Sequence, residues 1–313
     1  MKKKALIFGI TGQDGSYMAK LLIEKKYSVY GICRKKNYKN LKTLNLLTNV
    51  NLYISPKLNE LKILQLLKKN FDEIYFLGGQ SSVNDSFLKR IETYESQISP
   101  LKVILDYIVK QKGVKSKFLY AGSSEIYGNA NYKKKLTEDD EKKPVSPYGL
   151  SKFIGYEIIK SYRKMFNIPV CTAILFNHES PLRPEKFVFK KIINNVEKVW
   201  KNDKARLRVG NIEVKRDWGW GPEYMIGCHK ILNSKKIDDY IIATGKTIAL
   251  KKIIAQCFKE YNLNWKKYTI VEKKKYRKFE IKENYSNIKK LKKNIHWFPK
   301  NDYMSVIKRL SKP

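Results

Sequence analysis

The fold is decided by the stretch Lys4-Ala-Leu-Ile-Phe-Gly9-Ile-Thr-Gly12-Gln-Asp-Gly15 near the start of the chain. Its first part is a short apolar run of strand length, and apolar residues recur at helical spacing after Gly15. The three glycines have the spacing GxxGxxG, which allows a tight turn, close approach of a pyrophosphate, and close packing of helix on strand. The N-terminus of the following helix would face the phosphates. We therefore expect a dinucleotide-binding unit here.

Strand-like and helical segments alternate after this unit. Further strand-like runs lie at 29–33, 52–54, 74–77, 118–121 and 170–175, and helical stretches between them include 61–68, 101–112 and 148–166. This alternation predicts an α/β fold, a doubly wound parallel sheet of the Rossmann type with helices on both faces. From residue 177 onward the pattern breaks into short pieces rich in Gly and Pro. We divide the chain into a Rossmann domain of residues 1–176 and a smaller, irregular lobe of residues 177–313. This lobe would mainly bind substrate at the carboxyl ends of the strands, and some of its segments would return to the Rossmann domain.

Composition excludes several classes of protein. The chain has 313 residues and a formal net charge of +36, but its lysines are spread over every segment, which favours a solvated surface over a nucleic-acid site. Four scattered cysteines without a CxxC pattern argue against a disulfide scaffold or a zinc ribbon and suit the cytoplasm. No apolar run approaches the roughly 20 residues of a membrane span, and the N-terminus does not have the pattern of a signal peptide. We expect no nucleic-acid partner, no membrane partner and no metal.

The end of the second strand bears on the choice of cofactor. An NAD site usually places Asp or Glu there, to bond the 2′-hydroxyl of the ribose. This strand ends instead in Ile32-Cys33-Arg34-Lys35-Lys36. Because cations can pair with a 2′-phosphate, the sequence favours NADP. The alternative is that these are ordinary surface cations.

Two short motifs indicate a reaction centre. Tyr148 and Lys152 form YxxxK after Pro147, and residues four apart lie on one face of a helix. We expect the ammonium to lower the pKa of the phenol, which would make it an acid or base near neutral pH. Ser123 and Glu125 place a hydroxyl and a carboxylate at the end of the fifth strand. Each motif alone is common on helices or in turns, but together, after the glycine turn, they favour an enzyme.

These motifs resemble those of the extended short-chain dehydrogenase/reductases. Three longer strings, 9–17, 174–181 and 215–219, resemble the GDP-mannose 4,6-dehydratase family, and the resemblance runs from about residue 4 to the C-terminus. It implies a lyase that uses NADP and converts a GDP-linked sugar, GDP-mannose or a close relative, to the 4-keto-6-deoxy sugar. The steps would be oxidation at carbon 4, loss of water across carbons 5 and 6, and reduction at carbon 6. It also implies a homodimer or homotetramer.

The resemblance assigns roles to individual positions. Ser123 would be the catalytic hydroxyl where the family usually has Thr, with Glu125 as base and Tyr148 and Lys152 as the phenol and its partner. Contacts to the cofactor would come from Gly9, Thr11, Gly12, Gln13, Asp14, Arg34, Leu77, Gln80, Ser81, Tyr94, Lys152, His178 and Arg183. Contacts to the GDP-sugar would come from Asn177, Lys191, Arg216, Arg277 and Glu280. An arginine such as Arg216 beside a tryptophan is also, by its own chemistry, suited to clamp a diphosphate.

The chain departs from the family's pattern in places. The segment 37–51 is shorter than in relatives, which favours a dimer over a tetramer. Around the pair Gln80-Ser81, Gly78-Gly79 and Ser82 replace the family's Ala-Ala and His, which leaves the exact hexose open. Two alternatives also remain open at this stage. One is a GDP-sugar 4-reductase, epimerase or dehydrogenase of the same fold, and the other is a catalytically inactive module that binds polyanions.

Overall fold

A parallel sheet forms the centre of the molecule. The computed structural model describes residues 2–56, 58–129, 134–202, 204–277 and 279–311. Within them a seven-stranded sheet has the order β10-β6-β5-β4-β1-β2-β3. The strands are β1 (Lys4–Phe8), β2 (Ser28–Cys33), β3 (Val50–Ile54), β4 (Glu73–Phe76), β5 (Lys117–Ser123), β6 (Val170–Leu175) and β10 (Tyr240–Ile242). The predicted doubly wound α/β fold is confirmed, although β10, with only three residues, gives no recognisable pattern in the sequence.

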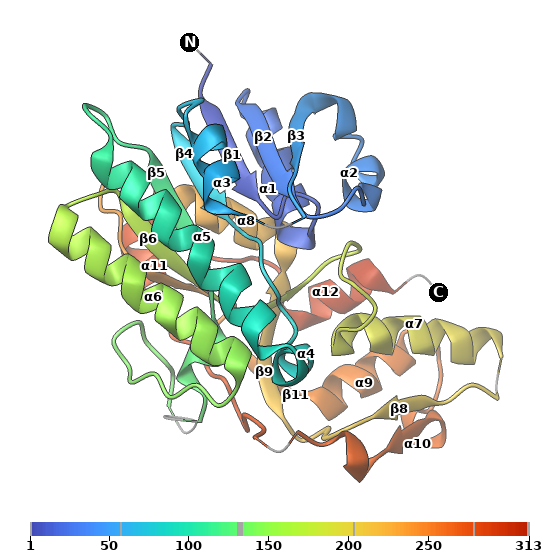
Figure 1. The fold of residues 1–313 in the computed structure, drawn as a ribbon. Helices are drawn as coiled ribbons and strands as arrows, with labels where there is room; N and C mark the ends of the chain where they lie inside the picture. Colours follow the sequence, from blue (N-terminus) through green and yellow to red (C-terminus); the bar gives the residue numbers. More distant parts are fainter. Residues whose placement is uncertain (1, 57, 130–133, 203, 278, 312–313) are drawn as a thin grey trace.

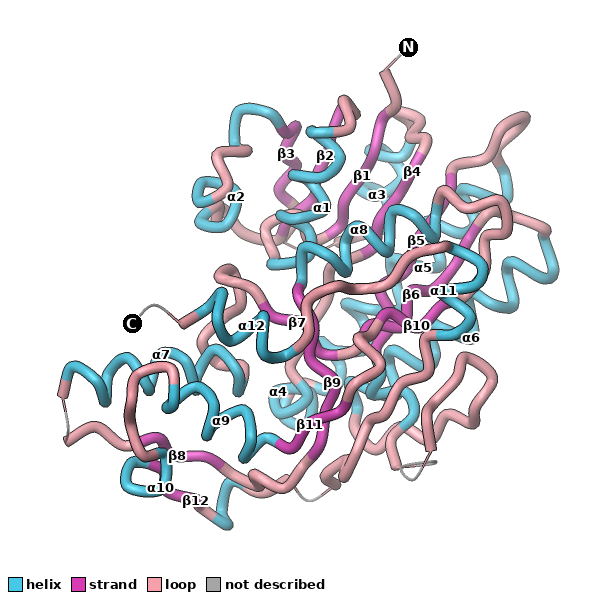
Figure 2. The backbone as a smooth tube through the Cα atoms, turned by 180° about the vertical axis from the view of Figure 1, so that it is seen from behind, coloured by secondary structure: helices cyan, strands magenta, loops and turns pink. Residues whose placement is uncertain are grey.

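Helices cover both faces of this sheet (Figures 1 and 2). One face carries α1 (Gln13–Glu24), α2 (Lys39–Thr43), α8 (Gly221–Leu232) and α11 (Lys289–Ile295), and the other carries α3 (Glu60–Leu67), α5 (Arg90–Lys110) and α6 (Pro147–Phe166). Side chains of β1 alternate between the two cores, with Ala5 and Ile7 in one and Leu6 and Phe8 in the other. Burial on both faces explains why the predicted strands are almost continuous apolar runs.

Helix α5 differs from the prediction. The sequence pattern placed it at 101–112, whereas it begins at Arg90 and contains Pro100. The first half of the helix buries Thr93 and Gln97, so its inward face is polar and lacks the apolar periodicity that marks a helix. Gln97 bonds to Lys152 in the candidate site described below, whereas Thr93 bonds to the Lys89 carbonyl one turn earlier, and both polar side chains break the apolar pattern.

The rest of the chain forms a second packed layer. It contains a three-stranded sheet, β7 (Asn177–Glu179), β9 (Lys215–Trp220) and β11 (Thr247–Ala249), and a parallel pair, β8 (Leu207–Val209) and β12 (Thr269–Val271). The helices α7 (Val188–Lys201), α9 (Leu250–Lys259), α10 (Trp265–Tyr268) and α12 (Tyr303–Leu310) pack on these strands. This part is more regular than the irregular lobe expected from the sequence, because most of its strands are too short to show a pattern.

The two parts of the chain are interleaved. Helix α8, strand β10 and helix α11 all follow residue 177 in the sequence, yet they pack in or on the large sheet (Figure 2). The division at residue 176 stays a prediction. The short helix α4 (Val83–Leu88) and the 3-10 turns at Leu47–Asn49, Ser124–Tyr127 and Lys273–Lys275 complete the described elements. None of the helices in the described ranges is long and apolar enough to cross a membrane.

Candidate active site

The glycine turn between β1 and α1 has the close packing that its spacing predicts. Gly9 has φ +80°, and a Cβ there would lie 2.6 Å from the Cα of Gly78. A Cβ on Gly15 would lie 2.2 Å from the carbonyl oxygen of Gly9. Helix α1 follows Gly12, which has no side chain to cap the first amides. The backbone therefore leaves the helix N-terminus open to a phosphate, which suits a dinucleotide.

A charged pair joins α1 to the start of the second part of the chain. Asp14 Oδ1 accepts from Gln13 Nε2 and from His178 Nε2, both at 2.9 Å. The other ring nitrogen, His178 Nδ1, lies 2.7 Å from the carbonyl oxygen of Phe176. Burial opposes the charged imidazole, but Asp14 outweighs burial and raises the pKa of His178. Burial likewise opposes the carboxylate, but His178 outweighs it and holds the pKa of Asp14 below its usual range.

Arg183 is held close to this pair. Its Nε lies 3.5 Å from Glu179 Oε2, and its guanidinium lies 3.7 Å from the ring centre of Phe187. Glu179 is buried, and burial raises the pKa of its carboxyl against the pull of Arg183. The structure thus brings together predicted cofactor residues from both parts of the chain, Asp14 on one side and His178 and Arg183 on the other.

The predicted reaction centre is assembled at the carboxyl end of β5. Ser123 ends this strand, and its Oγ accepts from the Glu125 amide at 3.3 Å. Ser146 caps α6 by accepting from the Gly149 amide at 3.0 Å, which fixes Tyr148 in the first turn. Burial raises the pKa of Tyr148 to about 12, although a hydrogen bond with Ser123 works in the opposite direction. A hydroxyl, a carboxylate and a phenol therefore share one site.

Lys152 corrects the prediction made for the phenol. Its amine donates to Gln97 Oε1 at 2.9 Å and to the Ala121 carbonyl at 2.7 Å, and it lies 5.9 Å from the ring centre of Tyr148. Burial lowers the pKa of Lys152 to about 7. The expectation that the ammonium lowers the pKa of Tyr148 is wrong for this structure, because desolvation dominates both groups.

Gln97 is a site residue that the sequence did not reveal. It is fully buried on α5, and while its Oε1 accepts from Lys152, its Nε2 donates to the Gln80 carbonyl at 2.9 Å. A single amide thus links Lys152, a predicted catalytic residue, to the loop of predicted cofactor residues after β4. The spacing of Thr93 and Gln97, four apart on one helix face, was the available signal, but both are polar.

Arg34 is paired with a carboxylate. It follows β2 directly, and its Nη1 lies 3.2 Å from Glu92 Oε1 of α5, with both side chains about half exposed. The end of β2 therefore faces the start of α5. Of the other predicted cofactor residues, Tyr94 is half-buried on α5, Leu77 follows β4, and Ser81 is exposed in the same loop.

Three of the five predicted substrate residues meet near Glu125. Glu280 Oε1 lies 3.4 Å from Arg216 Nη2 and 3.8 Å from Arg277 Nη1. Burial raises the pKa of Glu125, and the charges of Arg216 and Arg277 oppose this rise. These four side chains form one group of alternating charge.

The remaining two predicted substrate residues lie in other places. Lys191 donates from α7 to the Arg208 carbonyl at 2.7 Å, and burial together with Lys275 lowers its pKa. Among the described residues, Lys191 makes no contact with Glu125. Asn177 begins β7, opposite Trp218 of β9.

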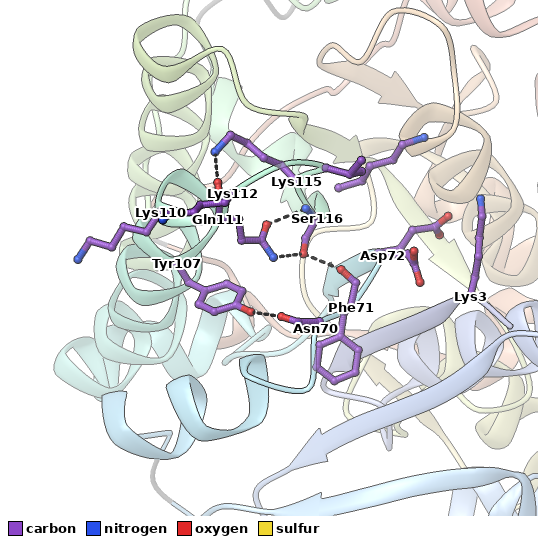
Figure 3. A pocket seen from close by; sticks show the side chains of 13 residues that line it. Lys3, Asn70, Phe71, Asp72, Tyr107, Lys110, Gln111, Lys112, Lys115 and Ser116 are labelled. Carbon is purple, nitrogen blue, oxygen red and sulfur yellow. Dashed lines mark hydrogen bonds between the residues drawn. The ribbon is translucent and has the colours of Figure 1, made fainter. Parts of the chain in front are cut away.

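A separate hollow lies at the amino edge of the large sheet (Figure 3). Its volume is about 660 Å³, and residues at the ends of β4, β5 and α5 line it. Its polar groups bond to one another: Gln111 donates to Ser116 Oγ, and Tyr107 donates to Asn70 Oδ1, both at 2.8 Å. The described residues that line it include none of the predicted site residues, so it is distinct from the candidate site.

Known proteins resemble this chain over nearly its whole length. A family profile described as GDP-mannose 4,6 dehydratase matches residues 6–310. The chain belongs to the GDP-mannose 4,6-dehydratase family. The GDP-mannose 4,6 dehydratase of Dictyostelium discoideum is 33% identical, over 99% of this chain and 95% of the relative. Members of this family are hydro-lyases, so the chain is an enzyme, and the alternative of an inactive polyanion-binding module is not supported.

Solved structures show the same fold. A dTDP-glucose 4,6-dehydratase of Bacillus anthracis in complex with NAD has a TM-score of 0.86 at 17% identity, covering 98% of this chain and 95% of that one. A structure called RMD from Pseudomonas aeruginosa, complexed with NADPH, has a TM-score of 0.78 at 17% identity, covering 99% and 98%. Among the described residues of this family member, no group of three or more His, Cys, Asp or Glu side chains is arranged to hold a metal ion.

Proposed function

We propose that this protein uses NADP to convert a GDP-linked sugar, GDP-mannose or a close relative, to the GDP-4-keto-6-deoxy sugar. The reaction comprises oxidation at carbon 4, elimination of water across carbons 5 and 6, and reduction at carbon 6. The observation that carries the proposal is the meeting of Ser123, Glu125 and Tyr148 at the end of β5. A dehydrogenase needs only the hydroxyl and the phenol, whereas elimination also needs a base, and membership of a dehydratase family supports this extra role for Glu125.

The residues present fit a nicotinamide dinucleotide. The crowded glycine turn and the open N-terminus of α1 suit its pyrophosphate, and the amine of Lys152 is held at the Ala121 carbonyl, two residues before Ser123. When bound, the nicotinamide would accept hydride from carbon 4 and return it to carbon 6. Arg34 after β2 supports NADP, since a guanidinium can pair with a 2′-phosphate. The 2′-phosphate would replace Glu92 as the partner of Arg34.

The phenol and the hydroxyl serve the oxidation step. Tyr148 takes the proton of the sugar's 4-hydroxyl, and Ser123 hydrogen-bonds the oxygen that becomes the ketone. Since the pKa of Tyr148 is raised to about 12, the phenol is protonated near neutral pH, and it needs a cation to act as a base. The charge of Arg183 opposes the rise in the pKa of Tyr148, and Lys152 orders the site through its hydrogen bonds to Gln97 and the Ala121 carbonyl.

Glu125 serves the elimination step. The ketone at carbon 4 acidifies the proton on carbon 5, the carboxylate removes that proton, and the hydroxyl on carbon 6 leaves as water. Burial raises the pKa of Glu125, which makes it a stronger base than an exposed carboxylate, while the charges of Arg216 and Arg277 oppose the rise. The site therefore has a base whose strength suits a weakly acidic carbon.

The experiment that tests the function compares Glu125→Gln with the unchanged enzyme in a single turnover with GDP-mannose and NADP. The variant keeps the size of the side chain but loses the basic oxygen, so the absorbance of enzyme-bound NADPH should rise and persist. The 6-deoxy product should form about 10²–10⁴-fold more slowly. Tyr148→Phe is the matched control, because it should block even the first reduction of the cofactor.

Two results would contradict the proposal. Dehydration by Glu125→Gln at nearly the unchanged rate would show that Glu125 is not the base. Steady consumption of added NADPH by the unchanged enzyme, with no loss of water detected by mass spectrometry, would indicate a 4-reductase instead.

The assembly and location of the enzyme are also proposed. Ile91 on α5 is 74% exposed and Leu150 on α6 is 38% exposed, and these two neighbouring helices offer an apolar surface for a second copy. We propose a dimer or a tetramer, which light scattering can distinguish. All four cysteines are free and buried, which supports a reducing compartment such as the cytoplasm.

A further inference from the structure

The amine of Lys152 lies over an aromatic ring and between uncharged acceptors. It is 4.8 Å from the ring centre of Tyr120 on β5, closer than the 5.9 Å to the ring centre of Tyr148. Its two hydrogen-bond acceptors are the Gln97 amide oxygen and the Ala121 carbonyl. Tyr120 is fully buried and Lys152 is 4% exposed, so little water reaches the amine. The face of the Tyr120 ring, which carries partial negative charge, therefore stands beside a desolvated amine.

Two glycines make room for this arrangement. A Cβ on Gly155, one turn after Lys152 on α6, would lie 2.6 Å from the hydroxyl oxygen of Tyr120. A Cβ on Gly79, which has φ +100°, would lie 2.3 Å from Nε2 of Gln97. The Tyr120 hydroxyl donates at 3.5 Å to Oε1 of Gln97, the oxygen that also accepts from Lys152. Because a side chain at either glycine would displace the ring or the amide, the sequence is fitted to this contact.

We propose that Tyr120 is a positioning residue for Lys152, and that its ring holds the amine beside the carboxyl end of β5 and stabilises the protonated form. A cation over the face of an aromatic ring is attracted to it, and the attraction is stronger where water is excluded. In this role Tyr120 acts only through Lys152. The contact exists in the protein alone, so the inference goes beyond the proposed function and does not depend on the substrate.

The titratable and charged groups that face Lys152 are Tyr120 on β5, Tyr148 on α6 and Asp14 on α1. Burial raises the pKa of Tyr120 well above 10 and that of Tyr148 to about 12. Burial opposes the carboxylate of Asp14, but His178 outweighs burial and holds the pKa of Asp14 below its usual range. Between pH 5 and pH 9 these three groups therefore keep their charge states.

Lys152 itself loses its proton within this range, because burial lowers its pKa to about 7. The attraction between ring and ammonium stabilises the folded state only while the amine is protonated. It is therefore present at pH 5 and is lost as the pH rises through the folded pKa of Lys152.

The test measures the free energy of unfolding in urea at pH 5 and pH 9 for Tyr120→Leu and the unchanged protein. Removing the ring should lower the proton affinity of folded Lys152 roughly tenfold, which corresponds to about 1.4 kcal/mol. Tyr120→Leu should therefore lose more stability at pH 5 than at pH 9, by about this amount. Where Tyr120→Leu does not fold, Tyr120→Met takes its place, because the flexible methionine side chain fills irregular gaps.

Three further variants separate this contact from ordinary packing. Tyr120→Phe keeps the ring and removes the hydroxyl, so it should lose the same stability at both pH values. Phe118→Leu is the matched control, because it removes a buried ring from the same strand and the same core, and its loss should also be independent of pH. Adding Lys152→Met to Tyr120→Leu should abolish the pH dependence of the loss. The titration of His178, the partner of Asp14, is common to all these proteins and cancels.

The outcomes decide the inference without any substrate. An equal loss at pH 5 and pH 9 in folded Tyr120→Leu overturns it, because the ring would then serve packing alone. A pH dependence that persists after Lys152→Met is added overturns it as well. In a single turnover with GDP-mannose and NADP, the first reduction of the cofactor should slow more in Tyr120→Leu than in Tyr120→Phe, and equal slowing contradicts the positioning role. If the unchanged protein reduces no cofactor, the proposed function fails, and the unfolding data still decide whether Tyr120 stabilises the charge of Lys152.

Discussion

Replacing Lys152 by methionine should change how the stability of the protein depends on pH. Burial lowers the pKa of Lys152 from its ordinary value of 10.5 to about 7, because the residue is 4% exposed. Both acceptors of its amine are uncharged, the Gln97 amide and the Ala121 carbonyl. In the unfolded chain the amine titrates near pH 10.4. Between about pH 7 and pH 10 the unfolded state therefore binds more protons than the folded state, and stability rises with pH.

The magnitude follows from the linkage between protons and folding. One group contributes about 1.4 kcal/mol to the free energy of unfolding for each pH unit inside this window. From pH 7 to pH 9 the free energy of unfolding of the unchanged protein should therefore rise by roughly 2 kcal/mol relative to that of Lys152→Met. The rise is smaller than the full slope would give, because near pH 7 the folded amine is still partly protonated. Below pH 7 the free energies of unfolding of the two proteins should change with pH in the same way, because Lys152 is then protonated in both the folded and the unfolded state. Methionine keeps most of the apolar stem of lysine. The contributions of the other titrating groups cancel when the free energies of unfolding of the two proteins are subtracted.

The assay is urea unfolding of both proteins at several pH values between 6 and 9, followed by circular dichroism after bound nucleotides are removed. Lys164→Met is the control, since Lys164 is exposed on the same helix and its removal should leave the pH dependence unchanged. A constant difference between unchanged protein and Lys152→Met across this range would refute the reasoning, because it would mean that Lys152 stays charged in the folded state. A loss of stability of the unchanged protein relative to Lys152→Met as the pH rises would refute it as well.

Three further predictions concern binding and catalysis. Arg34→Asp should lower NADP affinity by roughly ten- to a hundredfold and NAD affinity much less, since it removes a charge-assisted bond to the 2′-phosphate; calorimetry that finds equal losses would contradict the NADP assignment. Arg216→Ala should weaken GDP-sugar binding by a similar factor while NADP binding stays unchanged, and equal GDP-sugar affinity would show that Arg216 is structural. Gln97→Leu should lower kcat and weaken cofactor binding together, at about 1–3 kcal/mol for the buried groups left unpaired, and leave GDP affinity unchanged; steady-state kinetics showing a loss in GDP affinity alone would contradict this.

The fold could be predicted where local sequence carries a strong physical signal. Strands buried on both faces must be apolar, so β1 and β6 are evident, and the turn after Phe8 needs glycine because a Cβ on Gly9 or Gly15 would collide with backbone. Strands of three residues, such as β10, are too short to show a period, and their pairing depends on partners far along the chain. The sequence therefore indicates the first part of the fold well and the second part poorly.

The sequence predicts which residues lie at the candidate site, but it does not predict how burial changes their pKa values. Spacing correctly places Tyr148 and Lys152 on one helix face, yet spacing contains no information on desolvation, which raises the pKa of the phenol and lowers that of the amine. The first half of α5 was not predicted because it buries the polar residue Gln97. The amide of Gln97 accepts a hydrogen bond from Lys152 and donates one to the Gln80 carbonyl. An apolar residue there would have made the helix evident and left the lysine without its acceptor. The same buried glutamine therefore hides the helix in the sequence and helps to form the site. A buried polar side chain needs a hydrogen-bond partner, and here the partners are Lys152 and the Gln80 carbonyl.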